Sequence, residues 1–250
     1  MSVLDRLKKA SKPDGKKLFC VIAGQRLAGK SSLAGTLPGK TLMLQAAVLE
    51  SGSESARALA RRMGNELDVV AFNNNDELLE VLKELTTDTT YDNVFVDSLT
   101  AVTEQKSKEP AIIKMTAGNG FAAYKQIGVS AIDILEKLKE LTYAEKAKKA
   151  KNAFIACALK VKLDSNGEIA EVELESRGQM AVVAVTKYGE AVVTVLAPMR
   201  TETGETPHRL LTKTRDCWPG RVDGLLADQN PGEIDADLGK LLALFAGRSA

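Results

Sequence analysis

The sequence has little of what several kinds of chemistry require. His208 is the only histidine, so neither a histidine-based metal site nor a Ser–His–Asp triad is expected. The three cysteines form no CxxC pair, which favours a reducing compartment over a disulfide scaffold. Aromatic residues make up 4% of the chain, so any nucleic-acid binding has to depend on phosphate contacts more than on base stacking.

Strong charge bias and long apolar runs are also absent. The net charge is +1, so global basicity gives no argument for nucleic acid, and any such contact must come from local patches. No apolar run reaches membrane-spanning length, and the polar N-terminus lacks a signal-peptide core. With 44% hydrophobic and 27% charged residues, the sequence predicts a soluble globular protein of the cytoplasm.

The most informative segment is Gly24-Gln25-Arg26-Leu27-Ala28-Gly29-Lys30-Ser31, which fits the phosphate-binding loop motif. An apolar strand is expected before it, over 18–23, and a helix is expected to begin at Ser31. The glycines allow backbone angles closed to other residues, and the turned backbone can then aim its N–H groups at one phosphate. Lys30 is expected to reach the β- and γ-phosphates, and the Ser31 hydroxyl to ligate Mg²⁺. The predicted nucleotide-binding residues are Gly24, Gln25, Arg26, Ala28, Gly29, Lys30, Ser31 and Ser32.

A metal partner for this loop is expected at Asp97. Residues 93–98 form a short apolar run that ends in an acid and a serine, a pattern typical of a buried parallel strand. Such strands deliver their last residues to the crevice where ligands bind, so Asp97 is predicted to hold Mg²⁺ together with Ser31. Two alternatives stay open: a glycine turn followed by a solvated lysine, and an Asp97 that only caps the next helix.

Strand and helix patterns alternate along most of the chain. Strands are predicted over 18–23, 41–44, 67–72, 93–98 and 154–159, of which the first and the last two are expected to be buried, and helices over 53–63, 76–85 and 122–141. Such alternation is typical of a mostly parallel sheet covered by helices on both faces. The predicted fold class is therefore α/β, with a mostly parallel central sheet.

The last third of the chain has a different pattern. Residues 160–175 alternate about Ser165-Asn166-Gly167, which predicts a hairpin, and further strands are predicted over 181–185, 191–196 and 209–211. These strands are expected to form an antiparallel C-terminal extension of the sheet, followed by a terminal helix over 233–245. The polar, lysine-rich residues 1–15 are expected to form an N-terminal arm. Because no linker composition interrupts the rest, residues 16–247 are predicted to form a single domain.

Three features together resemble RecA-like phage P-loop ATPases: the phosphate loop, the acid strand ending Asp97-Ser98-Leu99-Thr100, and a β-rich tail containing Lys213-Thr214-Arg215-Asp216. The sequence is most similar in kind to the Sak-four class of single-strand annealing proteins, and the resemblance spans nearly the whole chain. It implies a RecA-like core that uses ATP and Mg²⁺, and the host-cell cytoplasm as the location of a phage-encoded protein.

The resemblance also implies a set of catalytic residues. Lys213 and Arg215 would reach across to the nucleotide of a neighbouring subunit. RecA-like enzymes usually carry a catalytic Glu at the end of the strand after the phosphate-loop helix, but here that strand runs into Gln45-Ala46-Ala47. Glu50 is the nearest acid and the expected replacement, Glu54 is the next candidate, and without either of them hydrolysis would be slow. The expected catalytic residues are Lys30, Glu50, Asp97, Lys213 and Arg215.

The predicted function is ATP binding and hydrolysis by a RecA-like protein that acts on single-stranded DNA in phage recombination, annealing or repair. The expected partners are single-stranded DNA, further copies of the chain in a ring or filament, and a phage single-strand binding protein, with no membrane. Candidate DNA contacts are the hairpin with Arg177, the segment 116–120, which is flexible by composition, and the lysine cluster over 146–151. One alternative is a small-molecule or nucleoside kinase with a lid containing Arg57, Arg61 and Arg62. Another is a nucleotide-gated annealing protein with little turnover.

Overall fold

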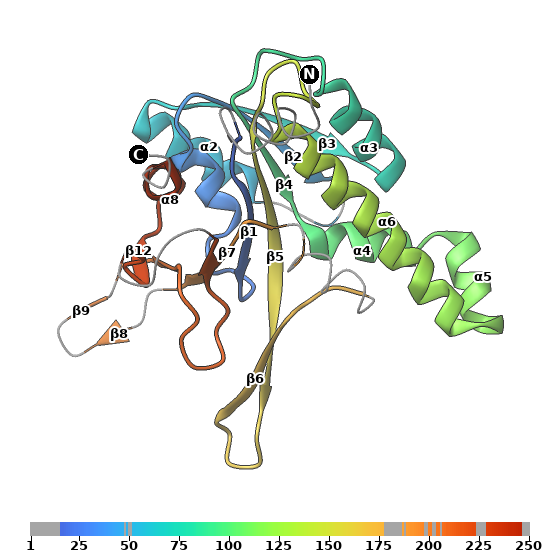
Figure 1. Ribbon diagram of the computed structural model, residues 1–250. Helices are drawn as coiled ribbons and strands as arrows, with labels where there is room; N and C mark the ends of the chain where they lie inside the picture. The colour runs from blue at the N-terminus through green and yellow to red at the C-terminus, as the bar shows by residue number, and fades with distance from the viewer. Residues whose placement is uncertain are drawn as a thin grey trace, which may run out of the picture.

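The structure, a computed structural model, describes residues 16–47, 49, 52–177, 187, 189–197, 200–201, 204–205, 207–223 and 229–246. These residues form a large twisted sheet with helices on both of its faces (Figure 1). Among the described helices, none is long and apolar enough to cross a membrane. The predicted N-terminal arm, 1–15, and the predicted strand over 181–185 lie outside the described residues.

Six parallel strands form the centre of the sheet. In spatial order from one edge they are β3 (Glu66–Phe72), β2 (Lys40–Ala46), β4 (Asn93–Asp97), β5 (Asn152–Leu163), β1 (Phe19–Gly24) and β7 (Ala191–Leu196). β1 is buried on both faces, as its continuous apolar run predicts for a central parallel strand. Phe19 and Val21 pack into one core, and Cys20 and Ile22 into the other. Burial of such a large apolar side chain contributes about 1.5–3 kcal/mol.

Antiparallel strands extend this centre, as the sequence predicts. β10 (Arg209–Leu211) pairs with β7, and β12 (Glu233–Asp235) pairs with β10, while the short β11 (Arg221–Val222) also pairs with β7. A separate two-stranded ribbon is formed by β8 (Arg200–Thr201) and β9 (Gly204–Glu205). The mostly parallel α/β fold with an antiparallel C-terminal extension is thereby confirmed.

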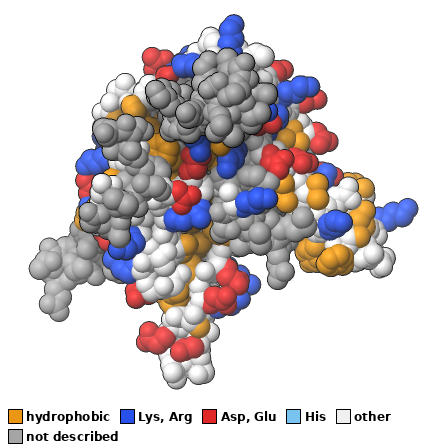
Figure 2. All heavy atoms as spheres, viewed as in Figure 1, with side chains coloured by type: hydrophobic (Ala, Val, Ile, Leu, Met, Phe, Trp, Pro, Cys, Tyr) orange, Lys and Arg blue, Asp and Glu red, His pale blue; other side chains and the backbone are white. Residues whose placement is uncertain are grey.

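The predicted hairpin is present and projects beyond the edge of the sheet. β6 (Ile169–Leu174) returns antiparallel along β5, and the turn places Gly167 at φ +83°, where glycine is favoured. Figure 1 shows the two strands leaving the body of the protein at the carboxyl ends of the parallel strands. Over 160–175 the chain carries five carboxylates and two lysines, and Figure 2 shows acidic side chains gathered on this projection.

The helices form two layers. One face of the sheet is covered by α3 (Asn75–Glu84), α4 (Leu99–Ser107) and α6 (Gly120–Leu141), which enclose one core. The other face is covered by the 3-10 helix η1 (Ser31–Thr36), α2 (Ser53–Met63) and α8 (Leu238–Ala246), which enclose the other core. α5 (Pro110–Gly118) packs on α6 and projects to the side of the body (Figure 1).

Three local expectations need correction. The segment 116–120, expected to be flexible, contains the end of α5 and the start of α6, because Asn119 caps α6 by accepting a hydrogen bond from the N–H of Ala122. The terminal helix begins at Leu238 and not at residue 233, since residues 233–235 pair with β10 and Asp237 accepts the N–H of Gly239 at the helix start. The helix after the phosphate loop is only the 3-10 turn η1, which ends at Thr36.

Candidate nucleotide site

The phosphate-loop segment forms a tight turn between the carboxyl end of β1 and η1. Leu27 and Gly29 adopt positive φ angles, +65° and +87°, and the Leu27 side chain is fully exposed at the tip of the turn. The N–H of Ala28 donates to the carbonyl of Gln25 at 3.2 Å, which closes the turn. The turn borders a cavity of about 370 Å³ at the carboxyl ends of the strands. Ligands bind at this edge in open α/β sheets.

The eight predicted nucleotide-binding residues divide into two groups. Five of them line this cavity: Arg26, Gly29, Lys30, Ser31 and Ser32. The other three do not line it: Gly24 ends β1, Gln25 borders an adjoining cleft, and Ala28 packs in a core. A Cβ at Gly24 would lie 3.3 Å from Cγ of Lys30, so this glycine allows the lysine stem to pass close to the backbone.

The Lys30 side chain folds back over the loop. Its Nζ donates to the carbonyls of Gly24, at 3.0 Å, and of Gln25, at 2.7 Å. The ammonium therefore lies inside the turn, where the oxygens of a bound polyphosphate can replace neutral carbonyls as acceptors. A charge-assisted bond to phosphate is stronger than one to a carbonyl, so ligand binding favours the exchange.

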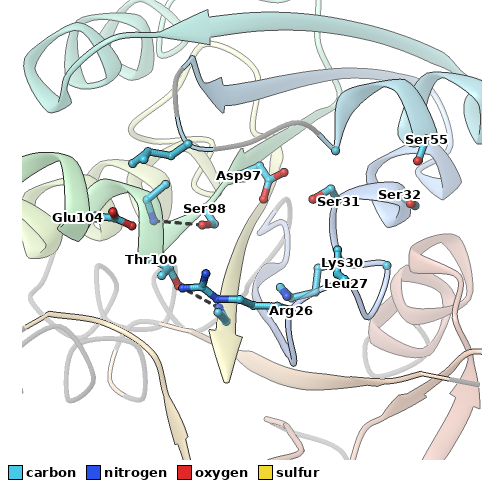
Figure 3. A pocket seen from close by; sticks show the side chains of 15 residues that line it. Arg26, Leu27, Lys30, Ser31, Ser32, Ser55, Asp97, Ser98, Thr100 and Glu104 are labelled. Carbon is cyan, nitrogen blue, oxygen red and sulfur yellow. Dashed lines mark hydrogen bonds between the residues drawn. The ribbon is translucent and has the colours of Figure 1, made fainter. Parts of the chain in front are cut away.

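Ser31 and Asp97 converge on one small space, as Figure 3 shows. A Cβ at Gly52 would lie 2.5 Å from Oγ of Ser31 and 3.5 Å from Oδ2 of Asp97, so both oxygens border the same point of the backbone. Asp97 is 1% exposed and stands at the carboxyl end of β4. A hydroxyl and a carboxylate are hard oxygen donors that suit Mg²⁺, which completes its shell with water and substrate phosphates. No group of three or more His, Cys, Asp or Glu side chains suited to a metal occurs among the described residues.

The alternative role for Asp97, as a helix cap, is excluded. Ser98 occupies the N-cap position of α4, and its Oγ accepts the N–H of Ala101 at 3.2 Å. Thr100, the second residue of α4, donates a hydrogen bond from Oγ1 to the carbonyl of Glu175 at 2.8 Å and accepts one from the N–H of Ala158 at 3.0 Å. The start of α4 is therefore held by the Ser98 cap and by the hydrogen bonds of Thr100, without the Asp97 side chain as cap. The Asp97 carboxylate faces the cavity.

The catalytic acid implied by the family resemblance is replaced by an amide. Gln45 pairs in register with Asp97, at the end of the strand next to β4, and is 8% exposed. Glu50, the predicted replacement, lies outside the described residues. Glu54 forms an exposed ion pair with Arg57 at 3.3 Å and does not line the cavity.

Glu104 is a carboxylate that sequence reasoning missed. Among the described residues it lines the cavity together with Asp97 (Figure 3). It stands four residues after Thr100 on α4, so both side chains occupy one face of the helix. A hydrogen bond from Lys108, at 2.7 Å, holds the pKa of Glu104 below its ordinary value and keeps the carboxylate charged. Spacing by one helical turn from the residues that follow the acid strand is the signal that could have identified it.

The hairpin is joined to the phosphate loop. Arg26 forms an ion pair with Glu175 at the base of the hairpin, at 3.0 Å. Arg26, Thr100 and Glu104 line both the phosphate cavity and a second cleft beside the hairpin. Lys160, in β5, lines this second cleft and not the phosphate cavity.

Lys213 and Arg215 lie in the segment between β10 and β11, and neither lines the phosphate cavity of its own chain. They follow the end of β10, so their two-residue spacing does not place both side chains on one face of that strand. Arg215 forms an ion pair with Glu233 at 3.1 Å, and both cations are exposed. Action on a neighbouring subunit stays a prediction.

The lysine cluster over 146–151 lies at the amino ends of the strands, directly before β5 and opposite the phosphate loop. Lys149 forms an ion pair with Asp92 at 2.8 Å, and the side chain of Lys151 is completely buried. These two lysines therefore have structural partners at this edge.

Comparison with known families matches this architecture. A family model described as an AAA domain, AAA_24, covers residues 16–220. The chain belongs to this family of P-loop AAA-type ATPases. Membership of the AAA_24 family agrees with a nucleotide site built on Lys30, Ser31 and Asp97, and family members use a nucleotide with Mg²⁺. Comparison with curated proteins gives no match to the chain.

Proposed function

We propose that this AAA_24 protein is an ATPase of RecA-like type that binds Mg²⁺–ATP at the phosphate loop and acts on single-stranded DNA. The observation that carries the nucleotide part is the convergence of Lys30, Ser31 and Asp97 at the carboxyl ends of β1 and β4. A cation, a hydroxyl and a buried carboxylate around one cavity are the donor set that a metal-bound triphosphate requires.

The chemistry follows from these positions. A lone pair of a water oxygen attacks the γ-phosphorus, the bond to the β,γ-bridging oxygen breaks, and its electrons leave with ADP. The proton of the water passes to a nearby carboxylate and from there to solvent. Lys30 would balance the charge of the β- and γ-phosphates, and Ser31 and Asp97 would hold Mg²⁺, which neutralises charge on the same oxygens when bound. Two carboxylates are candidates for orienting the water: Glu50, from the sequence, and Glu104, which lines the cavity.

The DNA part of the proposal is supported by a chain of adjoining hollows. The cleft beside the hairpin shares Arg26, Thr100 and Glu104 with the phosphate cavity, and it shares Arg177 with an apolar groove between α5 and α6. That groove contains Tyr124, which is 52% exposed. A guanidinium for phosphates beside an exposed ring for a base is the combination that binds single strands without sequence preference.

The charge of the hairpin restricts where single-stranded DNA could lie. Lys162 is paired with Glu171 and Glu173, at 2.8 and 3.0 Å, so it cannot serve phosphates without losing both partners. Hydrophobic side chains and lysines instead lie over α5 and the start of α6 (Figure 2), where Phe121 is 82% exposed. The proposed path therefore follows the α5–α6 side of the cleft, with Arg177 at its centre.

A gel-shift series with single-stranded DNA, with and without Mg²⁺–ATP, tests this assignment. We expect ATP to change the affinity for DNA, DNA to stimulate hydrolysis, and Arg177→Ala and Tyr124→Ala each to weaken DNA binding about tenfold. Lys146→Ala, an exposed lysine at the opposite edge of the sheet, is the matched control and should bind like wild type. Equal DNA affinity in wild type and all three variants would contradict the proposed path of the DNA.

A low-turnover annealing protein is the second candidate, and the amide of Gln45 is the observation that favours it. Tight ATP binding with one turnover or fewer per hour, together with ATP-dependent annealing of complementary strands, would identify it. The kinase alternative gains no comparable support. Arg57 pairs with Glu54, and Arg61 donates to the carbonyl of Arg57, so both lie on the exposed side of α2 and outside the phosphate cavity.

Assembly into a ring or filament completes the proposal. Arg215 is exposed and would reach a neighbour's γ-phosphate, where a cation supplied in trans can raise the rate by about 10³–10⁵. Arg215→Ala should keep ATP binding and lose DNA-stimulated hydrolysis, and mixing it with Lys30→Ala should restore part of the activity. No recovery at any mixing ratio, in assemblies confirmed by light scattering, would count against action in trans.

A further inference from the structure

A second cavity adjoins the phosphate loop and is used by nothing described so far. It has a volume of about 420 Å³, within the ~300–1,000 Å³ of small-molecule sites. It shares Gly29 and Ser32 with the phosphate cavity, so the two spaces meet at the loop itself. Its remaining walls come from η1, the carboxyl-terminal part of α2, β7 and the residues around β10 and β12.

His208 forms the wall that faces the loop. A Cβ at Gly29 would lie 3.4 Å from Nε2 of His208, so the imidazole lies directly against the phosphate-loop backbone. The side chain is exposed to the cavity, and no described residue hydrogen-bonds to its ring. A planar aromatic ring with an open face is suited to stacking on another planar ring.

The rest of the lining has an apolar part and a polar part with charges of both signs, which suits a partly polar group. The apolar part is formed by Leu59, Met63 and Val195. The polar part includes the guanidinium of Arg62 and the carboxylates of Asp235 and Asp237, and carboxylates can accept hydrogen bonds from hydroxyl and amino groups. The Asp237 carboxylate is held in place because its Oδ1 accepts the N–H of Gly239 at 2.7 Å.

We propose that this second cavity binds the nucleoside of the nucleotide whose phosphates lie on the loop, with the His208 ring stacked on the base. The inference rests on the proposed nucleotide-binding function and adds the determinant of base binding. It assigns affinity for the base to a residue about 180 positions after the loop in sequence, brought to Gly29 by the antiparallel extension of the sheet.

The test separates the nucleoside from the phosphates by using two probes, Mg²⁺–ATP and Mg²⁺–tripolyphosphate, in calorimetry. Base–aromatic stacking has a free energy of about 1–3 kcal/mol, so His208→Ala should weaken ATP binding about 5- to 150-fold. The same variant should bind tripolyphosphate like wild type, because the phosphate cavity is unchanged. His208→Phe keeps a planar ring and should restore ATP affinity to within about threefold of wild type.

Lys30→Ala is the matched control and should weaken both probes. If Lys30→Ala leaves ATP binding unchanged, the proposed nucleotide site itself fails, and the assignment of His208 fails with it. If Lys30→Ala behaves as expected but His208→Ala changes both probes equally, or neither, only the nucleoside assignment is overturned.

An independent readout uses the fact that the chain has one histidine. In the untagged protein, the ring-proton NMR signals of His208 need no assignment. ATP should move them upfield through the ring current of the stacked base, whereas tripolyphosphate should leave them within a small fraction of that shift. Equal shifts with both probes would overturn stacking.

Discussion

Lys30 and Lys151 each donate hydrogen bonds to backbone carbonyls, at opposite edges of the same sheet. Lys30 lies at the carboxyl ends of the strands and donates to Gly24 and Gln25, in a turn that borders an open cavity. Lys151 lies at the amino ends, directly before β5, and donates to the carbonyls of Leu85, Asp88 and Lys149 with its side chain completely buried.

The difference between the two lysines is access to other acceptors. The acceptors of Lys151 include the carbonyl of Leu85 at the C-cap of α3, so this ammonium satisfies backbone groups that the helix leaves without partners. Desolvation by burial lowers the pKa of Lys151, and no ligand can reach the group. Lys30 has partners that a phosphate can replace. One edge of the sheet therefore uses a lysine for stability, and the other keeps a lysine for binding.

The largest expected effect is on ligand binding at the carboxyl edge. Lys30→Ala should abolish measurable ATP binding, because it removes the point charge between the phosphates and leaves only the loop backbone. Its thermal midpoint should stay within about 2 °C of wild type, since the lost hydrogen bonds are to accessible carbonyls. Calorimetry and thermal melts of the two proteins check both statements. Unchanged ATP affinity would contradict the phosphate-loop assignment.

The next effect concerns turnover at the same edge. We expect Glu104→Gln to lower kcat about 100-fold and to leave ATP affinity within threefold, because the amide cannot accept a proton from water. Glu50→Gln in the same assay separates the two candidate carboxylates. Glu109→Gln is the matched control, since Glu109 forms a similar ion pair with Lys106, at 2.7 Å, but does not line the cavity. Loss of turnover in Glu50→Gln alone would give the role to Glu50.

The third prediction concerns a substitution at the amino edge that should lower stability without changing ATP binding. Lys151→Met keeps the apolar stem but leaves one buried and two partly buried carbonyls without a donor. An unsatisfied buried carbonyl costs about 1–3 kcal/mol and a partly buried one less, so the free energy of unfolding should fall by ~3 kcal/mol. Native Lys151→Met should still bind ATP like wild type. Urea unfolding with calorimetry below the transition tests the contrast. Retained stability in Lys151→Met would mean that water or a shifted backbone satisfies these carbonyls.

The sequence predicted the parallel strands and the phosphate loop well, because both depend on local pattern. The continuous apolar run over 18–23 is typical of a strand buried on both faces, and the loop motif is contiguous in sequence. It could not predict that Lys151 is buried whereas Lys146 is exposed, because burial depends on how α3 packs against the segment before β5.

The sequence also did not predict the residues that complete the site from more distant parts of the chain. Glu104 faces the cavity because Ser98 and Thr100 fix α4, and His208 reaches Gly29 because β10 pairs antiparallel with β7. The spacing of Glu104 by one helical turn from Thr100 is a weak signal for its position, whereas the contact of His208 leaves no periodic pattern in the sequence. The same holds for the acidic hairpin, whose alternation predicted its strands but not that Lys162 is already paired with Glu171.

The smallest expected effect is the pH dependence of the stability that Asp92 contributes at the amino edge. Asp92 accepts a hydrogen bond from Lys149 and another from the N–H of Lys40, and these bonds hold its pKa below the ordinary value of about 3.9. A carboxyl whose pKa is lower in the folded state stabilises the protein fully above the unfolded pKa, and this contribution is lost as the pH falls through the folded pKa. Asp92 is half exposed, so solvent screening limits the contribution to about 0.5–1 kcal/mol.

Asp92→Asn should therefore be less stable than wild type by this amount at pH 7, and the stability curves of the two proteins against pH should approach each other below about pH 4. Urea titrations at a series of pH values check this, and a stability difference that stays constant down to pH 3 would assign the effect to packing against Gly39 and not to charge.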